Sequence, residues 1–270
     1  MSKRTVVLPL VLLFGIIAAG LAINRNYFYV YLLAVSAPKY PTGEIIDNLV
    51  VYQIDPETIL TSLEEGNSSV FLPATKNPIY EDVAPLTPIS FFRWSQEDSL
   101  QVANALHQFV WGEPLNDWRL YSAGFTIPQC KDITKINGAG FRHYQRQKDW
   151  YFVVHDINID LEYGYVYAGD NNGYYTGKWE DIDVSQSAVK SADQALHIAE
   201  DNGGEEARLV LSDDQECHIS IFLSPHALFD RTWDGWGWEV TYWTKDGSLL
   251  LYGIIIDPYT GKYEILAANQ

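Results

Sequence analysis

The sequence predicts an α+β protein in which an N-terminal transmembrane helix precedes two tandem units, each built from one helix and an antiparallel sheet. Three observations predict this fold: an uncharged run near the N-terminus, an internal repeat, and apolar strands separated by turn residues in each repeat. The expected segments are a membrane anchor at 1–26, a proline-rich membrane-proximal connector at 27–90, a first unit at 91–180 and a second unit at 181–270.

The uncharged run predicts the membrane anchor. Thr5 to Ile23 is a stretch of 19 residues without a charge, close to the ~20 that a helix needs to cross a bilayer. Lys3 and Arg4 precede it and no acidic residue occurs before Glu44, so the positive-inside rule places the N-terminus in the cytoplasm. A cleaved signal peptide is the alternative. The expected localisation is a single pass of the cell membrane with an extracytoplasmic C-terminal domain.

Composition excludes two classes of protein. A chain of 270 residues that is 47% hydrophobic can bury a substantial core, so it is not a disordered chain. Its 18 basic and 35 acidic residues give a net charge of -17. Because such a surface repels phosphate backbones, the sequence also argues against a nucleic-acid-binding protein.

The repeat has a period of about 90 residues. Ser95-Gln96 and Ala105-Leu106-His107 recur as Ser185-Gln186 and Ala195-Leu196-His197, an offset of 90. In the second unit, Ser191 with Gln194 predicts a capped helix, and strands are expected at 208–211, 218–223, 238–243, 249–256 and 262–266. In the first unit, a helix face is followed by expected strands at 150–155 and 161–168 and by a turn at 170–173.

Three segments of the second unit carry a family resemblance. They are the alanine-rich helix at 191–199, the strand at 238–242, and the closing segment 254–262 with its Asp257-Pro258-Tyr259-Thr260-Gly261 turn. Over about residues 188–268 the chain resembles the PepSY domain family; the first unit joins this resemblance only through the internal repeat. The resemblance implies extracytoplasmic, often membrane-tethered modules that regulate peptidases, and it implies no catalytic residues.

A tryptophan-rich segment is the strongest binding candidate. Trp233, Trp236 and Trp238 are separated by small residues, so their indoles are candidates for a stacking platform for a sugar ring or an apolar peptide. The alternative is that they enter a strand and pack into the core. The only two cysteines, Cys130 and Cys217, have equivalent positions in the two repeats, and they form either a disulfide or two separate buried thiols.

Neither metal ligands nor a catalytic constellation is predicted. The six histidines form no local zinc motif, and no cofactor is expected; they occupy positions 107, 143, 155, 197, 218 and 226. Four oxygen-bearing residues alternate with apolar ones and are expected on one solvated strand face, with weak calcium binding as the alternative: Asp156, Asn158, Asp160 and Glu162.

These features predict an acidic, non-enzymatic protein of the membrane exterior. The expected function is protein binding that regulates or scaffolds a peptidase or a membrane protein complex. The alternative is a carbohydrate- or cell-wall-binding module that uses the tryptophan-rich segment.

Overall fold

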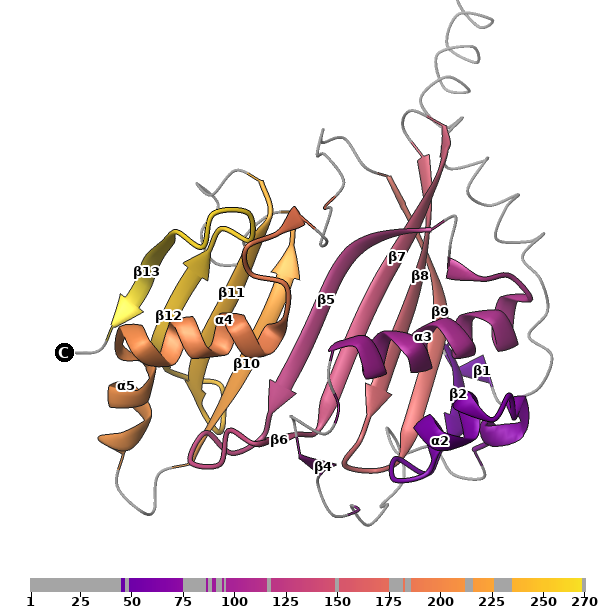
Figure 1. Ribbon diagram of the computed structural model, residues 1–270, viewed down its shortest axis with the longest axis horizontal. Coiled ribbons are helices and arrows are strands. Elements are labelled where there is room, and N and C mark those ends of the chain that lie inside the picture. Colours follow the sequence, from indigo (N-terminus) through magenta and orange to yellow (C-terminus); the bar gives the residue numbers. More distant parts are fainter. Residues whose placement is uncertain are drawn as a thin grey trace, which may run out of the picture. The chain divides into compact units, whose positions relative to one another are not determined.

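The computed structural model describes residues 45–46, 49–74, 86, 89–90, 94, 96–115, 118–148, 151–174, 182, 186–211, 216–225 and 235–268. Within these residues, eleven strands form one sheet in the order β1-β2-β9-β8-β7-β5-β10-β11-β12-β13, and β3 pairs with β2 (Figure 1). The strands are β1 Ile45–Ile46, β2 Leu49–Gln53, β3 Leu72–Pro73, β5 Arg119–Ile127, β7 Gly138–Lys148, β8 Tyr151–Asp160, β9 Tyr165–Tyr174, β10 Cys217–Ser224, β11 Gly237–Thr244, β12 Leu250–Ile256 and β13 Tyr263–Ala268. Two short strands, β4 Ile89–Ser90 and β6 Lys135–Ile136, pair separately.

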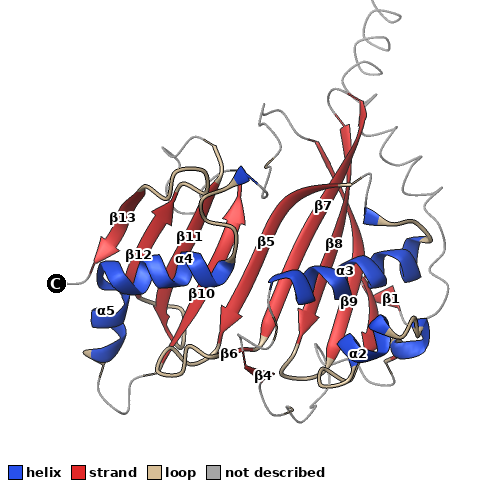
Figure 2. Cartoon of the chain, viewed as in Figure 1, coloured by secondary structure: helices blue, strands red, loops and turns tan. Residues whose placement is uncertain are grey.

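The two main helices lie on one face of this sheet (Figure 2). Helix α3, Gln96–Trp111, contacts β7, β8 and β9, and helix α4, Ala192–Ala199, contacts β10 and β11. The remaining helical segments are α2 Ile59–Glu64, the 3₁₀ turn η1 Ser68–Val70, the π-helical turn η4 Glu200–Gly204 and α5 Glu205–Leu209.

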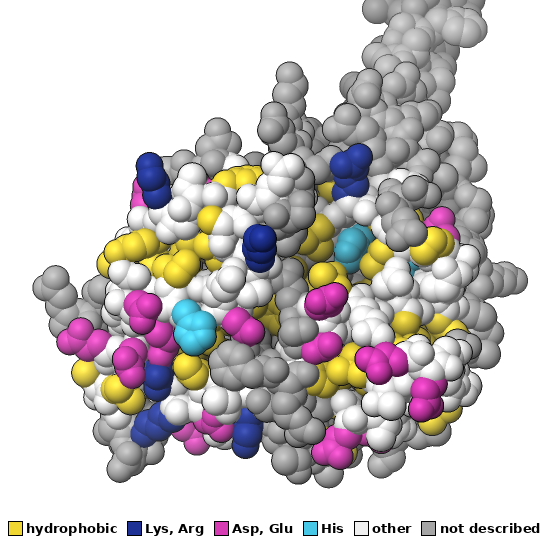
Figure 3. All heavy atoms as spheres, viewed as in Figure 1, with side chains coloured by type: hydrophobic (Ala, Val, Ile, Leu, Met, Phe, Trp, Pro, Cys, Tyr) yellow, Lys and Arg dark blue, Asp and Glu magenta, His cyan; other side chains and the backbone are white. Residues whose placement is uncertain are grey.

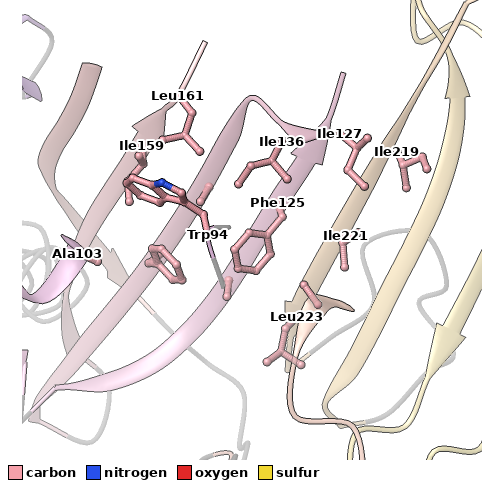
Figure 4. Packing of buried hydrophobic residues seen from close by; sticks show 14 of the residues in the cluster. Trp94, Ala103, Phe125, Ile127, Ile136, Ile159, Leu161, Ile219, Ile221 and Leu223 are labelled. Carbon is pink, nitrogen blue, oxygen red and sulfur yellow. The ribbon is translucent and has the colours of Figure 1, made fainter. Parts of the chain in front are cut away.

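The core lies between the helices and the sheet. Strand side chains alternate between faces, so in β5 the buried Ala123, Phe125 and Ile127 share one face. Ile219 and Ile221 of β10 continue the same apolar layer, which Figure 4 shows from close by. This layer and the apolar residues of α3 and α4 belong to one cluster, so the opposite face of the central strands is a separate surface.

The prediction of two tandem helix-plus-sheet units was wrong. Strands β5 and β10 are hydrogen-bonded neighbours, with Ile127 opposite Ile219 and Ala123 opposite Leu223, so one continuous sheet runs through the region assigned to both units. The physical reason is that both strands would otherwise be unpaired edges carrying apolar side chains. Pairing them satisfies the backbone groups and buries those side chains together.

The prediction of a transmembrane anchor is also corrected, and with it the membrane keywords and the single-pass localisation. Among the helices of the described residues, none is long and apolar enough to cross a bilayer. The segment predicted as the anchor, 1–26, lies outside the described residues.

Several local predictions can be compared with the structure. The predicted cap of α4 is confirmed, because the Ser191 hydroxyl accepts the Gln194 backbone N–H at 3.3 Å. The expected strand at 208–211 was wrong, since residues 205–209 form α5. The expected turn at 170–173 was also wrong: these residues belong to β9, which pairs with β8 along its whole length. Continuous pairing with a long neighbour overrides the turn preference of an Asp-Asn-Asn-Gly stretch.

Candidate functional site

A groove of about 630 Å³ lies on the face of the central strands that points away from the helices. Its lining comes from β5, β7, β8, β9, β10 and β11, from Asn137 just before β7 and from the turn between β8 and β9. The strand alternation that turns Phe125 toward the core turns Gly124 and Thr126 toward this groove. A volume of this size is within the range of protein sites that hold small molecules or short peptide segments.

Glycines form the floor of the groove. Gly124 and Gly140 are direct Cα partners on β5 and β7, so two neighbouring strands lack side chains at the same level. A Cβ atom at Gly124 would lie 2.8 Å from Cδ2 of Phe222, and one at Gly140 would lie 2.9 Å from Oδ1 of Asn158. The missing side chains therefore let the flanking phenyl ring and carboxamide lean over the floor. Gly138 is different, because a Cβ there would meet nothing closer than 3.6 Å.

Carboxylates lie toward both ends of the groove. Asp160 of β8 and Glu162 of the following turn line one end, and Glu239 of β11, which is only 3% exposed, lies at the other. Burial raises the pKa of Asp160, although its carboxylate accepts the backbone N–H groups of Glu162 and Tyr163 at 3.1 and 3.2 Å. The Glu162 carboxylate accepts a hydrogen bond from Nδ2 of Asn137 at 3.0 Å. These contacts fix the orientation of the acidic groups at the β8 end.

Arg142, the cationic side chain among the described lining residues, is already paired with a carboxylate. Nε of Arg142 lies 2.9 Å from Oδ1 of Asp156, its cross-strand neighbour on β8. Aromatic side chains complete the walls: Tyr163, Tyr167, Phe222 and Trp243. The groove therefore combines negative charge with aromatic faces, which attract cations.

Of the four residues expected on one strand face, three lie on β8 and point to the groove side. Asn158 and Asp160 line the groove, Asp156 pairs with Arg142, and Glu162 lines the groove from the turn. No group of metal-ligating side chains suited to holding an ion was found among the described residues.

The tryptophan-rich segment is placed only in part. Trp236 is 6% exposed and Trp238 is fully buried, with its indole N–H donating to the carbonyl of Val189 at 3.2 Å. Trp233 lies outside the described residues. An indole buried to this extent presents no face to a sugar ring, so these two side chains act in the core.

The two cysteines meet at the junction of β5 and β10. Cys130 and Cys217 are disulfide-bonded, their Cα atoms lie 5.4 Å apart, and the Cys130 N–H donates to the Cys217 carbonyl at 2.9 Å. The bond lies where the chain segments of the two predicted units join into one sheet.

A second cluster, of buried histidines, lies on the helix side of the sheet. Nδ1 of His107 on α3 is 2.7 Å from the Glu113 carbonyl, and Nε2 of the same ring is 2.8 Å from Nδ1 of His155 on β8. Nε2 of His155 is 3.2 Å from Oδ1 of Asp170 on β9. We call these contacts the histidine chain. His107 is fully buried and His155 is 5% exposed, so the chain is shielded from water.

Two indoles enclose the middle of the histidine chain. The rings of Trp111 and Trp118 both stack on His155, each with its centroid 3.9 Å from the imidazole and interplanar angles of 7° and 24°. Two indoles this close cannot share one face of an imidazole, so they cover both faces. Trp111 also donates its Nε1 hydrogen to Oδ1 of Asp170 at 2.9 Å.

Sequence reasoning did not find the histidine chain. His107 was paired with His197 through the repeat, whereas the structure places His107 in the core and His197 exposed on α4. Asp170 was assigned to a turn. A signal was nevertheless present, since His155 belongs to an alternating strand whose apolar neighbours face the core.

Comparison with protein-family models, with curated proteins and with solved structures found no match for this chain. The resemblance of residues 188–268 to the PepSY family therefore stays a prediction. The function has to be argued from the groove itself.

Proposed function

We propose that this protein is a non-enzymatic binding protein whose groove holds an extended, positively charged segment of a protein partner. The observation that carries the proposal is the glycine floor between acidic and aromatic walls on the face that the helices leave uncovered. Phe222 and Asn158 lean over Gly124 and Gly140, but nothing lies closer than 3.6 Å to the Cβ position of Gly138, so another backbone can approach the sheet closely there.

The length of the groove suits an extended peptide. From Asp160 on β8 to Glu239 on β11 the sheet crosses β7, β5 and β10, a span of roughly 19 Å at the usual distance between strands. An extended chain rises about 3.3 Å per residue, so roughly six residues bridge the two acidic ends. A basic residue near one end of the segment would lie beside Asp160 and Glu162, and one near the other end would be attracted at a distance by Glu239, whose side chain is 3% exposed.

The negative net charge of the protein favours a basic partner. The net charge of -17 repels nucleic acids and acidic proteins and attracts basic segments at long range. Asp and Glu side chains are also spread over the helix-bearing face (Figure 3), so the attraction is a property of the molecule as well as of the groove. The resemblance to PepSY domains makes a peptidase the first partner class to test.

A glycan-binding function at the tryptophan-rich segment has weaker support. Trp236 and Trp238 are buried, and the groove aromatics Phe222 and Trp243 share the groove with carboxylates, which suit a cation better than a neutral sugar.

Filling the groove tests the proposal. Gly138→Val would project a branched side chain into the groove from a strand position with free space, so the fold should persist. The probe is a fluorescent peptide with lysines at both ends and four neutral residues between them, and binding is followed by anisotropy. We expect the variant to bind at least about tenfold more weakly, a loss of about 1.4 kcal/mol. Equal affinities of the variant and the native chain would refute binding in the groove.

A charge-matched pair of variants tests the electrostatic part. Glu162→Gln keeps an oxygen to accept the Asn137 hydrogen bond but removes a groove charge, whereas Glu264→Gln removes an exposed charge on β13. We expect the first variant to weaken binding of the lysine peptide roughly two- to fivefold and to reduce its salt dependence. The second should leave affinity nearly unchanged. Similar losses in both would mean that net charge alone attracts the peptide.

A further inference from the structure

We propose that two copies of this chain associate through the outer edges of their β13 strands, which pair antiparallel about a two-fold axis at Tyr263. The inference is independent of the groove, because it concerns the end of the sheet and not its open face. It rests on the free edge of β13, on the exposure of its side chains and on their charges.

Strand β13 is the last strand at its end of the sheet. Among the described residues it pairs with β12 on one side and with no strand on the other (Figure 1). The opposite end of the described sheet is β1, which has only two residues and offers little backbone to a partner. Because the free N–H and C=O groups of an edge strand can pair with another strand, β13 is the edge suited to association.

The hydrogen bonds of the hairpin between β12 and β13 show which backbone groups face outward. The Asp257 N–H donates to the Lys262 carbonyl at 2.7 Å, so the backbone of Lys262 faces the β12 side. Since consecutive residues of an antiparallel strand point their backbone groups to opposite sides, those of Tyr263 and Ile265 point away from β12. These two residues therefore supply the hydrogen-bonding groups of the free edge.

The side chains at the start of β13 are exposed on both faces of the sheet. Tyr263 is 44% exposed and Ile265 is 51% exposed. Both lie on the helix-bearing face, because their Cα partners on β12 are the core residues Ile256 and Ile254. Glu264 is exposed on the other face. A strand that solvent reaches on both faces leaves room for a second strand beside it.

The charges of β13 favour one register of the pairing. When Tyr263 lies opposite Tyr263 of the second copy, each Lys262 lies opposite a Glu264, so two ion pairs flank the axis. These positions form non-hydrogen-bonded pairs, in which the side chains are closest. A register that places Glu264 opposite itself brings like charges together, and one centred on Ile265 leaves both charged residues without an opposite charge.

The interface is small, so the dimer should be weak. A ladder of about five residues buries less than the roughly 1,200 Å² of a typical stable complex. The net charge of -17 on each copy adds a repulsion that salt screens. We therefore expect a dissociation constant on the order of 10 to 100 μM in about 0.5 M sodium chloride.

Sedimentation velocity of the full chain, from about 5 to 300 μM, tests the association. We expect monomers at the lowest concentration and mostly dimers at the highest. Glu264→Lys places lysines opposite each other on both sides of the axis, so its dissociation constant should rise at least about tenfold. Because this variant makes the net charge less negative, a change in overall repulsion alone would strengthen association instead. Both charged positions are exposed, so the fold should persist.

Exchanging the charges tests the register. The double variant Lys262→Glu/Glu264→Lys restores opposite charges across the axis at the native net charge, so it should dimerise as tightly as the native chain. An equimolar mixture of the single variants Lys262→Glu and Glu264→Lys should form heterodimers at concentrations where each alone is monomeric. A native chain that stays monomeric up to the highest concentration, a Glu264→Lys variant that dimerises as tightly as the native chain, or a double variant that does not recover would each overturn the proposal.

Discussion

The junction between β5 and β10 gives the prediction with the best-defined magnitude. Cys130 and Cys217 close a loop with a sequence separation of 87 residues. In the chain-entropy description, a cross-link over a loop of this length stabilises the folded state by roughly 4 to 5 kcal/mol at 25 °C, because it restricts the unfolded chain. Replacing both cysteines by alanine should remove that contribution, and the loss of two buried sulfur atoms adds about 1 kcal/mol.

Urea unfolding measures the effect. If the dependence of the free energy on urea is about 3 kcal/mol per molar, the double alanine variant should unfold at a midpoint lower by roughly 1.5 to 2 M. The slope of the unfolding free energy against urea concentration should also increase, because a chain without the cross-link exposes more surface on unfolding. The native protein treated with reductant is the control and should unfold close to the variant.

Two results would refute the reasoning. One is a midpoint for the variant that matches that of the untreated native chain. The other is mass spectrometry after alkylation of the unfolded, untreated protein that finds both cysteines modified, since a disulfide leaves no thiol to react.

Two further predictions concern β7 and the groove floor. Burial, and to a smaller extent the charge of His107, lowers the pKa of His143 to about 4, so the folded state resists its protonation. The contribution of His143 to the free energy of unfolding should therefore be constant above pH 6.5 and fall by up to about 1.4 kcal/mol per pH unit from pH 6.5 toward pH 4. The variant His143→Gln should lack this fall when urea midpoints are compared at pH 7 and pH 5. Gly124→Ala should cost about 1 to 3 kcal/mol, since its Cβ would meet Phe222 at 2.8 Å, whereas Gly138→Ala should stay within about 0.5 kcal/mol. Equal thermal stability of the two alanine variants would contradict the described floor.

Local patterns predicted local structure well. The cap of α4 and the strands that became β10, β11, β12 and β13 follow from alternation and turn residues alone. The sequence also predicted which side chains of β8 share the groove face, because alternation places Asn158 and Asp160 on one face regardless of the neighbouring strands.

The sequence did not predict which strands pair with one another in the sheet. The floor of the groove needs Gly124 beside Gly140, which depends on the pairing of β5 with β7 and on a register that no local pattern states. The merged sheet depends on β5 pairing with β10, two strands far apart in the chain, as in the pair Ile127 and Ile219. The repeat suggested separate units because similarity in sequence says nothing about which strand edges meet.

The placement of Asp170 shows how a local preference can mislead at a residue with tertiary contacts. Asp170-Asn171-Asn172-Gly173 has the composition of a turn, and only pairing with β8 draws it into a strand. Asp170 then faces His155, its Cα partner, while His107 arrives from a helix 48 residues earlier in the chain. A buried polar network of this kind follows from tertiary packing.

The groove and the histidine chain use opposite faces of the same strand. In β8, the odd-numbered His155 and Ile157 point toward the helices, and the even-numbered Asn158 and Asp160 point into the groove. A substitution on one face therefore changes one site without touching the contacts of the other, provided that the register with β7 is kept. That register is well determined, because a slip by one residue would turn Ile157 out of the core and Asn158 into it. Variants of Asp170 and of Gly138 therefore alter the contacts of opposite faces of the sheet.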